Sequence, residues 1–343
     1  MKKPFSSSLI IGSLFLNLAA MFLSLGLFVA LVFFKPQDSG IKLFRQIREN
    51  SDKHQLINPL LACEVSEKKD VSEFTPLKNE INQVIYNGIN SKAVTTASIY
   101  FDTRDGRWLG INTQEKFYPA SLMKVPTMIA FYKAAETKPK ILNQKVFYNG
   151  TYNLNLGQFY QPAKKLTSGT EYTVDELIRR MVAYSDNNAL PLLQKNIDDS
   201  ELREVLTDLG ISLPSGELQA DFMTVKSYAS FFRVLFNATY LSRDMSEKAL
   251  EILTEPDFPG GIVSSVPSNI SVAQKFGETT FGSDFHDPAA KKELHDCGII
   301  YYPDHPYLMC IMTKGNDFNK MAEVIHNIAN AAFDHINKEY KKY

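Results

Sequence analysis

Three short groups of polar residues, far apart in the sequence, have the types and spacing that acyl transfer requires. The first is Ser121-Leu122-Met123-Lys124. On a helix, residues three apart lie on one face, so the Lys124 amine can approach the Ser121 hydroxyl. A serine becomes a good nucleophile when a base takes its proton, and a lysine can be that base if burial or a neighbouring cation lowers its pKa. Ser121 at a helix start would also place its backbone N–H where negative charge develops.

The second group, Ser185-Asp186-Asn187, directly follows a predicted helix. The Ser185 hydroxyl can relay a proton, and the Asn187 amide can bind both a substrate carbonyl and a lysine side chain. The same residue types are also favoured helix caps, and Ser121 taken alone is better explained as an N-cap beside a solvated lysine. Each of these two groups is therefore a weak indicator by itself.

The third group, Lys275-Phe276-Gly277-Glu278, lies at the end of a predicted strand. Here Lys275 can anchor an anionic group of a substrate and steady Ser185, while Gly277 lets a ligand approach the strand edge closely. The backbone N–H of Glu278 can complete an oxyanion hole. Such a segment is usually just an exposed strand end, so the prediction depends on all three groups meeting at one cleft.

The elements that must bring these groups together are strands near both ends of the folded part and helices between them. The predicted helices span 77–89, 121–136, 174–184, 188–197, 200–209, 225–240 and 318–340, and the predicted strands span 97–101, 108–111, 271–276, 297–302 and 307–313. This order implies one sheet assembled from distant segments and packed against a helical subdomain, which is an α+β fold. Clefts commonly form where two such halves meet.

The ordered motifs resemble those of the serine β-lactamase and penicillin-binding protein superfamily, most closely the class A β-lactamases, whose set is S-x-x-K, S-D-N and K-T-G. In this sequence they begin at Ser121, Ser185 and Lys275. Each falls in the matching context: a helix start, a loop between helices, and a late strand followed by a hairpin and a C-terminal helix. The resemblance covers about residues 74–343, and it implies an antiparallel sheet built from both chain ends with an inserted all-helical subdomain.

The resemblance also implies a role for each residue. Ser121 would be the nucleophile, Lys124 its base or proton relay, Ser185 the proton shuttle to the leaving nitrogen, Asn187 the binder of the substrate amide, Lys275 the carboxylate anchor, and the Ser121 and Glu278 N–H groups the oxyanion hole beside Gly277. The implied reaction is opening of a β-lactam ring, or cleavage of a D-Ala-D-Ala type stem peptide of peptidoglycan, through an acyl-serine intermediate. It needs no metal and no organic cofactor.

Two departures from the class A pattern limit this expectation. Phe276 replaces the hydroxyl residue of K-T-G, so we expect weak recognition of ordinary penicillins. Segment 210–221 should carry the glutamate and asparagine that activate the deacylating water, but it lacks the E-x-x-x-N pattern. Glu217 and Asp221 are the candidates to replace that glutamate. We therefore predict acylation but not efficient turnover, and two alternatives stay open: a penicillin-binding DD-peptidase or transpeptidase with slow deacylation, and a non-catalytic cell-wall-binding module.

The N-terminus predicts a membrane anchor. Residues 4–34 contain no charged side chain, and the apolar run 9–34 would be about 39 Å long as a helix, enough to cross a hydrocarbon core of about 30 Å. The run ends without the small-residue cleavage site of a signal peptide, although a cleaved signal stays the alternative. We predict a cytoplasmic tail over 1–8, a single transmembrane helix in the cell membrane over 9–34, a linker over 35–73 and an extracytoplasmic domain over 74–343.

Composition excludes some partners and leaves the cysteines and histidines with modest roles. The net charge of -1 lacks the excess of Lys and Arg that nucleic-acid binding needs. Cys63, Cys297 and Cys310 are too few for a disulfide scaffold, and no spacing suggests a zinc site. Cys297 and Cys310 fall near opposite positions of two predicted strands, where packing in the core is favoured over a bridge. His286 and His295 follow the third motif, where we expect solvated loop histidines.

Overall fold

The structure is a computed structural model, and it describes residues 54–58, 72–214, 220–255, 258–282, 287 and 289–340. These residues belong to one compact unit that begins at His54. The predicted cytoplasmic tail and transmembrane helix, and most of the predicted linker, lie outside the described residues. Within the described residues, no helix combines the length and the apolar character that a membrane crossing requires.

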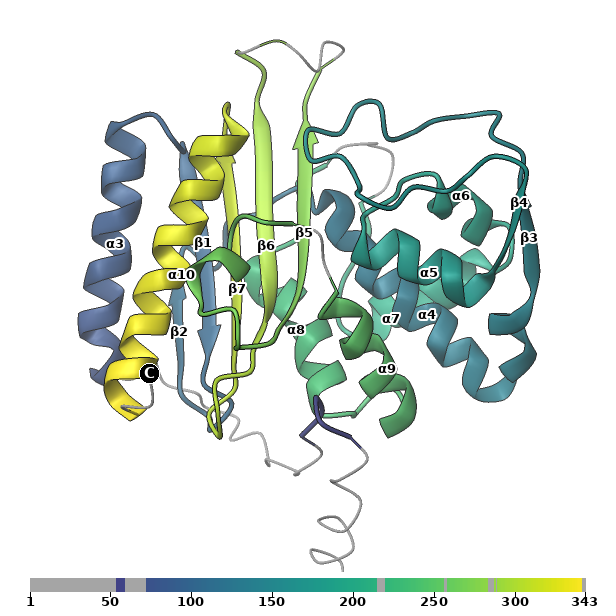
Figure 1. Ribbon diagram of the computed structural model, residues 1–343. Helices are drawn as coiled ribbons and strands as arrows, with labels where there is room; N and C mark the ends of the chain where they lie inside the picture. Colours follow the sequence, from purple (N-terminus) through teal and green to yellow (C-terminus); the bar gives the residue numbers. More distant parts are fainter. Residues whose placement is uncertain are drawn as a thin grey trace, which may run out of the picture. The chain divides into compact units, whose positions relative to one another are not determined.

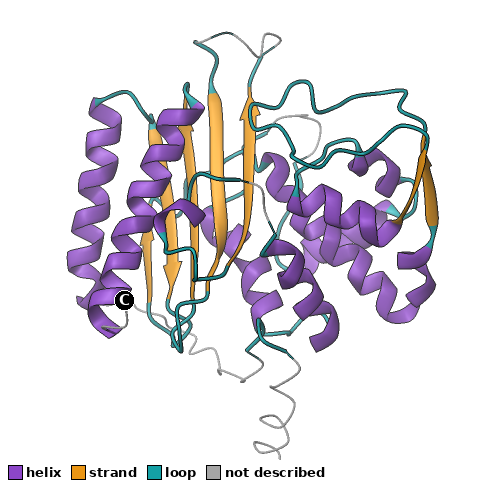
Figure 2. Ribbon diagram, in the orientation of Figure 1, coloured by secondary structure: helices purple, strands orange, loops and turns teal. Residues whose placement is uncertain are grey.

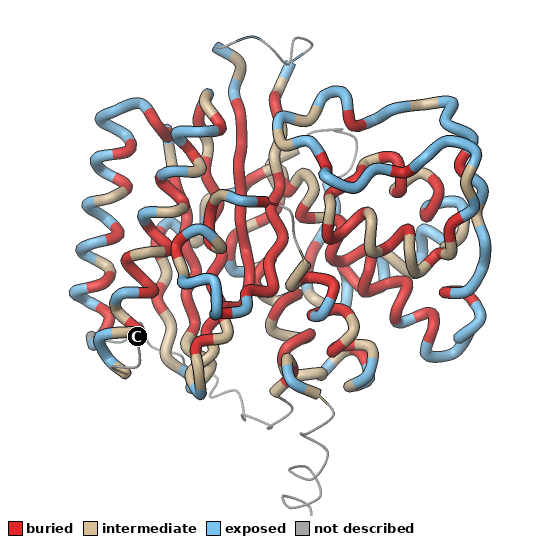
Figure 3. Tube along the Cα trace, in the orientation of Figure 1, coloured by how far each residue is buried: buried red, intermediate tan, exposed pale blue. Residues whose placement is uncertain are grey.

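A five-stranded antiparallel sheet forms the centre of the domain, and its strands come from both ends of the chain (Figure 1). Its strands are β1 (Thr96–Asp102), β2 (Trp108–Ile111), β5 (Val272–Thr280), β6 (Lys292–Ile300) and β7 (Tyr307–Gly315). The order across the sheet is β2-β1-β7-β6-β5, so the N-terminal hairpin pairs with the last strand. Nearly every residue of β1, β6 and β7 is buried, because helices cover both faces of the sheet (Figure 3).

Two long helices, both predicted from the sequence, cover one face of the sheet (Figure 2). They are α3 (Thr75–Asn90), which follows the short 3-10 helix η2 (Ser72–Phe74), and α10 (Phe318–Tyr340). Buried apolar residues recur at helical spacing in α3, at Leu77, Ile81 and Ile85. They join apolar side chains of α10 and of the sheet in one core cluster.

The helical subdomain lies against the opposite face and beside the β5 edge. Its elements are the 3-10 helices η3 (Ala120–Met123) and η4 (Pro139–Asn143), and the α-helices α4 (Lys124–Thr137), α5 (Val174–Ala183), α6 (Ala189–Gln194), α7 (Asp199–Asp208), α8 (Val225–Phe236) and α9 (Arg243–Leu253). A further 3-10 helix, η5 (Val263–Ser265), packs on α10 instead. Helix α8 packs on β1, β6 and β7, and α9 packs on β5. Helix α4 is buried on almost every side, which is typical of a central helix.

One α-helix and two strands were not predicted from the sequence. Helix α9 begins after Ser242, whose hydroxyl accepts a hydrogen bond from the Met245 N–H, and this N-cap was a local signal. The strands β3 (Lys145–Tyr148) and β4 (Thr170–Thr173) form a separate two-stranded sheet. The segment 149–169, which we call the β3–β4 loop, separates the two strands, so no local pattern marks them as a pair.

A short stretch of the predicted linker is docked on the domain. The Glu247 carboxylate accepts hydrogen bonds of 2.6 to 3.0 Å from the backbone N–H groups of Gln55, Leu56 and Ile57. The Ile57 side chain is buried in the core, and the Tyr301 hydroxyl donates a hydrogen bond to the Leu56 carbonyl. The folded unit therefore includes a segment that lies upstream of residue 74.

Two expectations about the strand β6 were wrong. Cys297 and Cys310 form a disulfide, because the register of β6 on β7 places them directly opposite each other on one face. His295 is not a solvated loop residue but is fully buried within β6, which begins well before the predicted strand. The first part of β6 was not predicted as a strand because its residues are mostly polar. Cys63 and His286 lie outside the described residues.

Candidate active site

Ser121 lies in the 3-10 turn η3, because α4 begins only at Lys124 and not at residue 121 as predicted. Pro126 has no backbone N–H and cannot donate to the Leu122 carbonyl as a regular α-helix would require. That carbonyl instead accepts a hydrogen bond of 3.0 Å from the buried Tyr228 hydroxyl. Since side chains at i and i+3 eclipse in a 3-10 helix, Ser121 and Lys124 still lie on one side.

The turn η3 packs directly on the edge strand β5 at Gly277. A Cβ atom at this position would lie 3.0 Å from the Pro119 carbonyl oxygen and 3.1 Å from the Leu122 nitrogen. We expected the space beside Gly277 to admit a ligand, but the structure fills it with the backbone of η3. The glycine thus fixes the nucleophile turn against the third motif.

The Lys124 amine lies at the centre of the site. Its Nζ is 2.9 Å from the Ser185 carbonyl oxygen, 3.0 Å from Ser185 Oγ and 2.6 Å from Asn187 Oδ1. Burial, together with the positive charge of Lys275, lowers the pKa of Lys124 well below its usual value. A neutral amine has two N–H donors, which the two carbonyl oxygens can take, and a lone pair that is then free to accept a proton.

Ser185 lies between two lysines. Its Oγ lies 3.0 Å from Lys124 Nζ and accepts a hydrogen bond from Lys275, whose Nζ is 3.2 Å away. Burial lowers the pKa of Lys275 to about 7, although nearby carboxylates oppose this change. Ser185 also has a left-handed backbone with φ of 56°, which is uncommon for a residue with a Cβ. The two amines and this hydroxyl form a connected path for a proton.

Sequence analysis missed the residues that hold the second motif in place. The buried Asp186 carboxylate accepts a hydrogen bond of 2.7 Å from Asn155 Nδ2, and Asn155 Oδ1 accepts one of 2.8 Å from the Asn187 N–H. Gln158 Nε2 donates to the Ser185 carbonyl at 3.0 Å. Both Asn155 and Gln158 lie on the β3–β4 loop, which has no periodic pattern that could have indicated this contact.

The backbone N–H of Glu278 is directed toward the cleft. At the two ends of β5, odd-numbered residues hydrogen-bond to the neighbouring chain, from the Tyr301 N–H to the Ser271 carbonyl and from the Phe281 N–H to the Lys291 carbonyl. In an antiparallel pair the bonding direction alternates, so the Glu278 N–H points away from β6. Because β5 is an edge strand, that side faces η3, as an oxyanion-hole donor must.

The Glu278 side chain ties the β3–β4 loop to β5. Its Oε1 accepts hydrogen bonds from the Phe159 N–H at 2.8 Å and the Tyr160 N–H at 3.1 Å. Burial raises the pKa of Glu278 to about 7, although these bonds and the charge of Lys275 favour the ionised form. An acidic group with a pKa near neutrality thus stands one residue after the third motif.

Two cavities meet at Ser121. One has a volume of about 190 Å³ and reaches under the β3–β4 loop, and the other, of about 330 Å³, extends toward Gln194 and Leu202. Ser121, Asn187 and Glu278 line both of them. Residues from η3, the second motif and β5 therefore face a common space. In the described part of the chain, no group of three or more His, Cys, Asp or Glu residues is arranged to hold a metal ion.

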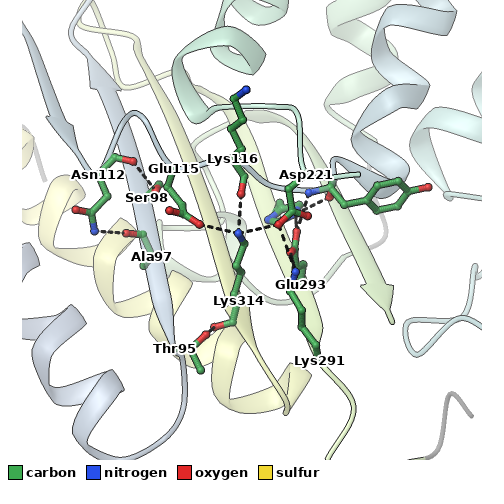
Figure 4. A network of polar contacts seen from close by, with 12 residues as sticks. Thr95, Ala97, Ser98, Asn112, Glu115, Lys116, Asp221, Lys291, Glu293 and Lys314 are labelled. Atoms are coloured by element: carbon green, nitrogen blue, oxygen red, sulfur yellow. Dashed lines mark hydrogen bonds and ion pairs between the residues drawn. The ribbon is translucent and has the colours of Figure 1, made fainter. Parts of the chain in front are cut away.

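The candidate base Asp221 is engaged elsewhere. Its Oδ2 accepts hydrogen bonds from Lys314 Nζ at 2.9 Å and Lys291 Nζ at 3.3 Å, in the network that Figure 4 shows. Burial opposes ionisation of Asp221, but the hydrogen bond from Lys314 and the charges of both lysines lower its pKa. Asp221 lines neither cavity at Ser121. The other candidate, Glu217, lies outside the described residues.

Known proteins share the fold that holds this site. A sequence model described as the Beta-lactamase enzyme family matches residues 76–336, whereas no curated protein sequence matches the chain. The solved structure of PBP-A is similar, with 19% identity, a TM-score of 0.62, and coverage of 77% of this chain and 97% of that chain. A PBP-A mutant, solved as an acyl-enzyme complex with penicillin G, has 18% identity and a TM-score of 0.61 over 76% of this chain and 97% of its own.

A class A β-lactamase from Mycobacterium abscessus is similar to the same degree, with 19% identity and a TM-score of 0.61 over 76% of this chain and 99% of that chain. At such identities these structures establish the fold, an antiparallel sheet with a helical subdomain. The matched segment 76–336 contains all three motifs and every element that positions them. The chain therefore belongs to the beta-lactamase enzyme family, within the serine β-lactamase and penicillin-binding protein superfamily.

Proposed function

We propose that the protein is an active-site serine hydrolase that opens β-lactams, or related D-Ala-D-Ala-like amides, through an acyl-serine intermediate. The observation that carries this proposal is the environment of the Lys124 amine. It is buried, its pKa is lowered, and its hydrogen bonds lead to Ser185 and Asn187 beside the cavities of Ser121. These residues are sufficient for acyl transfer without a metal or organic cofactor.

Acylation would begin with proton transfer from Ser121 to Lys124 and continue along the hydrogen bond that joins Lys124 to Ser185. Lys124 takes the proton from the Ser121 hydroxyl while Oγ attacks the carbonyl carbon of the amide. The Ser121 and Glu278 N–H groups stabilise the negative charge on the carbonyl oxygen. The proton then passes from Lys124 through Ser185 to the leaving nitrogen, the C–N bond breaks, and the acyl group stays as an ester on Ser121.

A penicillin-binding DD-peptidase or transpeptidase with slow deacylation is the second candidate. Its support is the position of Asp221, which is paired with Lys314 and Lys291 and lines neither cavity at Ser121. Hydrolysis of the ester needs a base that activates a water molecule. Without such a base, the acyl-enzyme persists, and the natural substrate would be a peptidoglycan stem peptide.

We also propose that the chain is anchored in the cell membrane by a single helix over 9–34, with the domain outside the cytoplasm. The support is the absence of charged residues over 4–34, and a buried disulfide between Cys297 and Cys310 suits an oxidising compartment. The lipid bilayer would then be a partner of the chain. Protease added to spheroplasts should digest the domain, and full protection of the domain would contradict this orientation.

The test of the enzymatic proposal is a time course of intact mass for the full chain in detergent, mixed with a penicillin or a reactive cephalosporin. Ser121→Ala is the control. An adduct on the wild type alone that decays as product accumulates supports a β-lactamase, and a persistent adduct supports the penicillin-binding function. The absence of an adduct at any concentration would contradict both and leave a non-catalytic cell-wall-binding module, for which Ser121→Ala should change no measurable function.

A further inference from the structure

We propose that Glu278 makes this site selective for acyl donors that lack a carboxylate next to the scissile amide, so that neutral or cationic amides react faster than anionic ones. The inference rests on the proposed acylation of Ser121 and specifies its substrate class. It follows from three features of the third motif: the place of the Glu278 carboxyl, the charges around it, and the loss of the usual carboxylate-binding groups.

Glu278 lies beside the candidate nucleophile. The residue lines both cavities that meet at Ser121, and its backbone N–H faces the cleft as a candidate oxyanion donor. The carboxyl is held in this place by the Phe159 and Tyr160 N–H groups. An acyl group bound at Ser121 therefore lies next to a fixed carboxyl group.

The cations that face Glu278 do not cancel its charge in alkaline solution. Lys124 and Lys275 are the cations that act on it, and neither lies within ion-pair distance of a carboxylate in the described part of the chain. Burial lowers the pKa of Lys275 to about 7 and that of Lys124 well below its usual value. At pH 8 most Lys275 side chains are neutral, whereas most Glu278 carboxyls, with a pKa of about 7, are ionised.

The first two residues of the third motif offer no free group to a substrate carboxylate. Phe276 has no hydroxyl, and its ring is fixed by a stacked contact with Phe258 at 4.5 Å and an edge contact with Tyr160 at 5.8 Å between ring centroids. Lys275 Nζ lies 4.3 Å from the Phe276 ring centroid and donates to Ser185 Oγ. A carboxylate here would meet a like charge in a partly desolvated cleft, whereas an amide N–H or an ammonium would meet an acceptor.

Penicillin G and its methyl ester form a matched pair of probes, because they differ only in the carboxylate. The second-order rate constant for Ser121 acylation of the full chain is measured at pH 8 by quenched intact mass. Each value is divided by the rate of hydroxide hydrolysis of the same compound, which removes the difference in intrinsic reactivity. We expect the wild type to prefer the ester by about tenfold or more, the size of a close like-charge effect.

Three variants assign the preference to the Glu278 charge. Glu278→Gln removes the charge and keeps an oxygen for the Phe159 and Tyr160 N–H groups, so the preference for the ester should fall by about tenfold. Glu278→Asp keeps the charge and should keep the preference. Glu171→Gln, an exposed position on β4, makes the same chemical change far from the cleft and should behave as the wild type.

Each possible result either supports or contradicts the proposed selectivity. A wild type that reacts equally fast or faster with the acid overturns the proposed selectivity, and an unchanged preference in a folded Glu278→Gln overturns its assignment to this residue. If Glu278→Gln does not fold, the ratio of the ester rate to the acid rate is compared between the wild type and Glu278→Asp. Loss of the preference for the ester in Glu278→Asp would contradict the charge argument. Labelling of Ser121 by neither compound overturns the proposed function itself, whereas labelling by the ester alone supports both proposals.

Discussion

Two clusters in this domain contain lysines and carboxylates, but the lysines form ion pairs in only one of them. In the network of Figure 4, Lys314 Nζ lies 2.6 Å from Glu115 Oε1 and 2.9 Å from Asp221 Oδ2. In the candidate active site, Lys124 and Lys275 are more deeply buried, yet within the described residues neither has a carboxylate at ion-pair distance. The first cluster pairs its cations, and the second surrounds them with neutral acceptors.

The pKa values diverge accordingly. Burial opposes the charge of Lys314, but hydrogen bonds to Glu115 and Asp221 raise its pKa above the usual value. For Lys124 and Lys275, burial dominates and lowers the pKa. Pairing thus keeps a lysine charged, so that it can hold segments together, whereas burial without pairing lowers the pKa of an amine so that it can exchange protons more readily.

The largest effect is expected when the unpaired amine is removed. Lys124→Met should lower the rate of Ser121 acylation by about 10³-fold, the contribution typical of a positioned general base. Its free energy of unfolding should stay equal to that of the wild type or rise, because a desolvated amine without an ion pair is lost. Intact mass and urea denaturation measure the two quantities. A variant that acylates at the wild-type rate would remove Lys124 from the mechanism.

The next effect concerns Asp296, a fully buried carboxyl on β6 that has no cationic partner at ion-pair distance in the described residues. Burial raises its pKa to about 7, above the ordinary value of 3.8, so its stabilising contribution is present at low pH and is lost as the pH rises through 7. The free energy of unfolding of Asp296→Asn, relative to that of the wild type, should therefore increase by roughly 2–3 kcal/mol from pH 5 to pH 8. Urea denaturation of both proteins at both pH values tests this, and a difference that is the same at pH 5 and pH 8 would refute it.

A smaller effect is expected in the paired cluster. Lys314→Met should lower the free energy of unfolding by about 1–2 kcal/mol, because the carboxylates of Glu115 and Asp221 lose a partly buried partner. The loss should shrink in 1 M salt, which screens the repulsion that remains. A Lys314→Met variant as stable as the wild type in low salt would show that the pairing does not stabilise the domain.

The smallest effect is expected for an exposed pair. Lys145 Nζ lies 3.7 Å from Glu171 Oε2 on the small β3–β4 sheet, and both side chains are largely exposed. Lys145→Ala should change the free energy of unfolding by less than about 0.5 kcal/mol, since water and salt screen such a pair. This variant sets the baseline against which the Lys314→Met loss is measured by the same denaturation experiment. An equal loss in both would remove the distinction between the clusters.

The candidate catalytic residues were predictable because their types and local spacing carry the signal. Ser121, Lys124 and Lys275 each stand in a motif that can be read without knowledge of the fold, and the structure brings them to one site. The core helices were predictable for the same reason, since apolar spacing is local. The α3 and α10 helices therefore agree closely with the sequence-based ranges.

The supporting residues were not predictable because their contacts are long-range. Asn155 and Gln158 belong to a loop without periodicity, and only the folded chain shows that they hold Asp186 and Ser185. The disulfide depends on the register of β6 on β7, which a one-residue change would abolish. His295 looked like a loop residue, because the polar side chains around it are paired only after the sheet has formed.

The pairing of the first strand with the last has a consequence for the nascent chain. β2 ends at Ile111, and β7, which separates β1 from the rest of the sheet, begins only at Tyr307. Until β7 has been synthesised, β1 has only β2 as a partner, and an isolated hairpin is marginally stable. A chain arrested on the ribosome before Tyr307 would contain all three motifs and still lack the assembled site, so activity begins only after β7 has been synthesised.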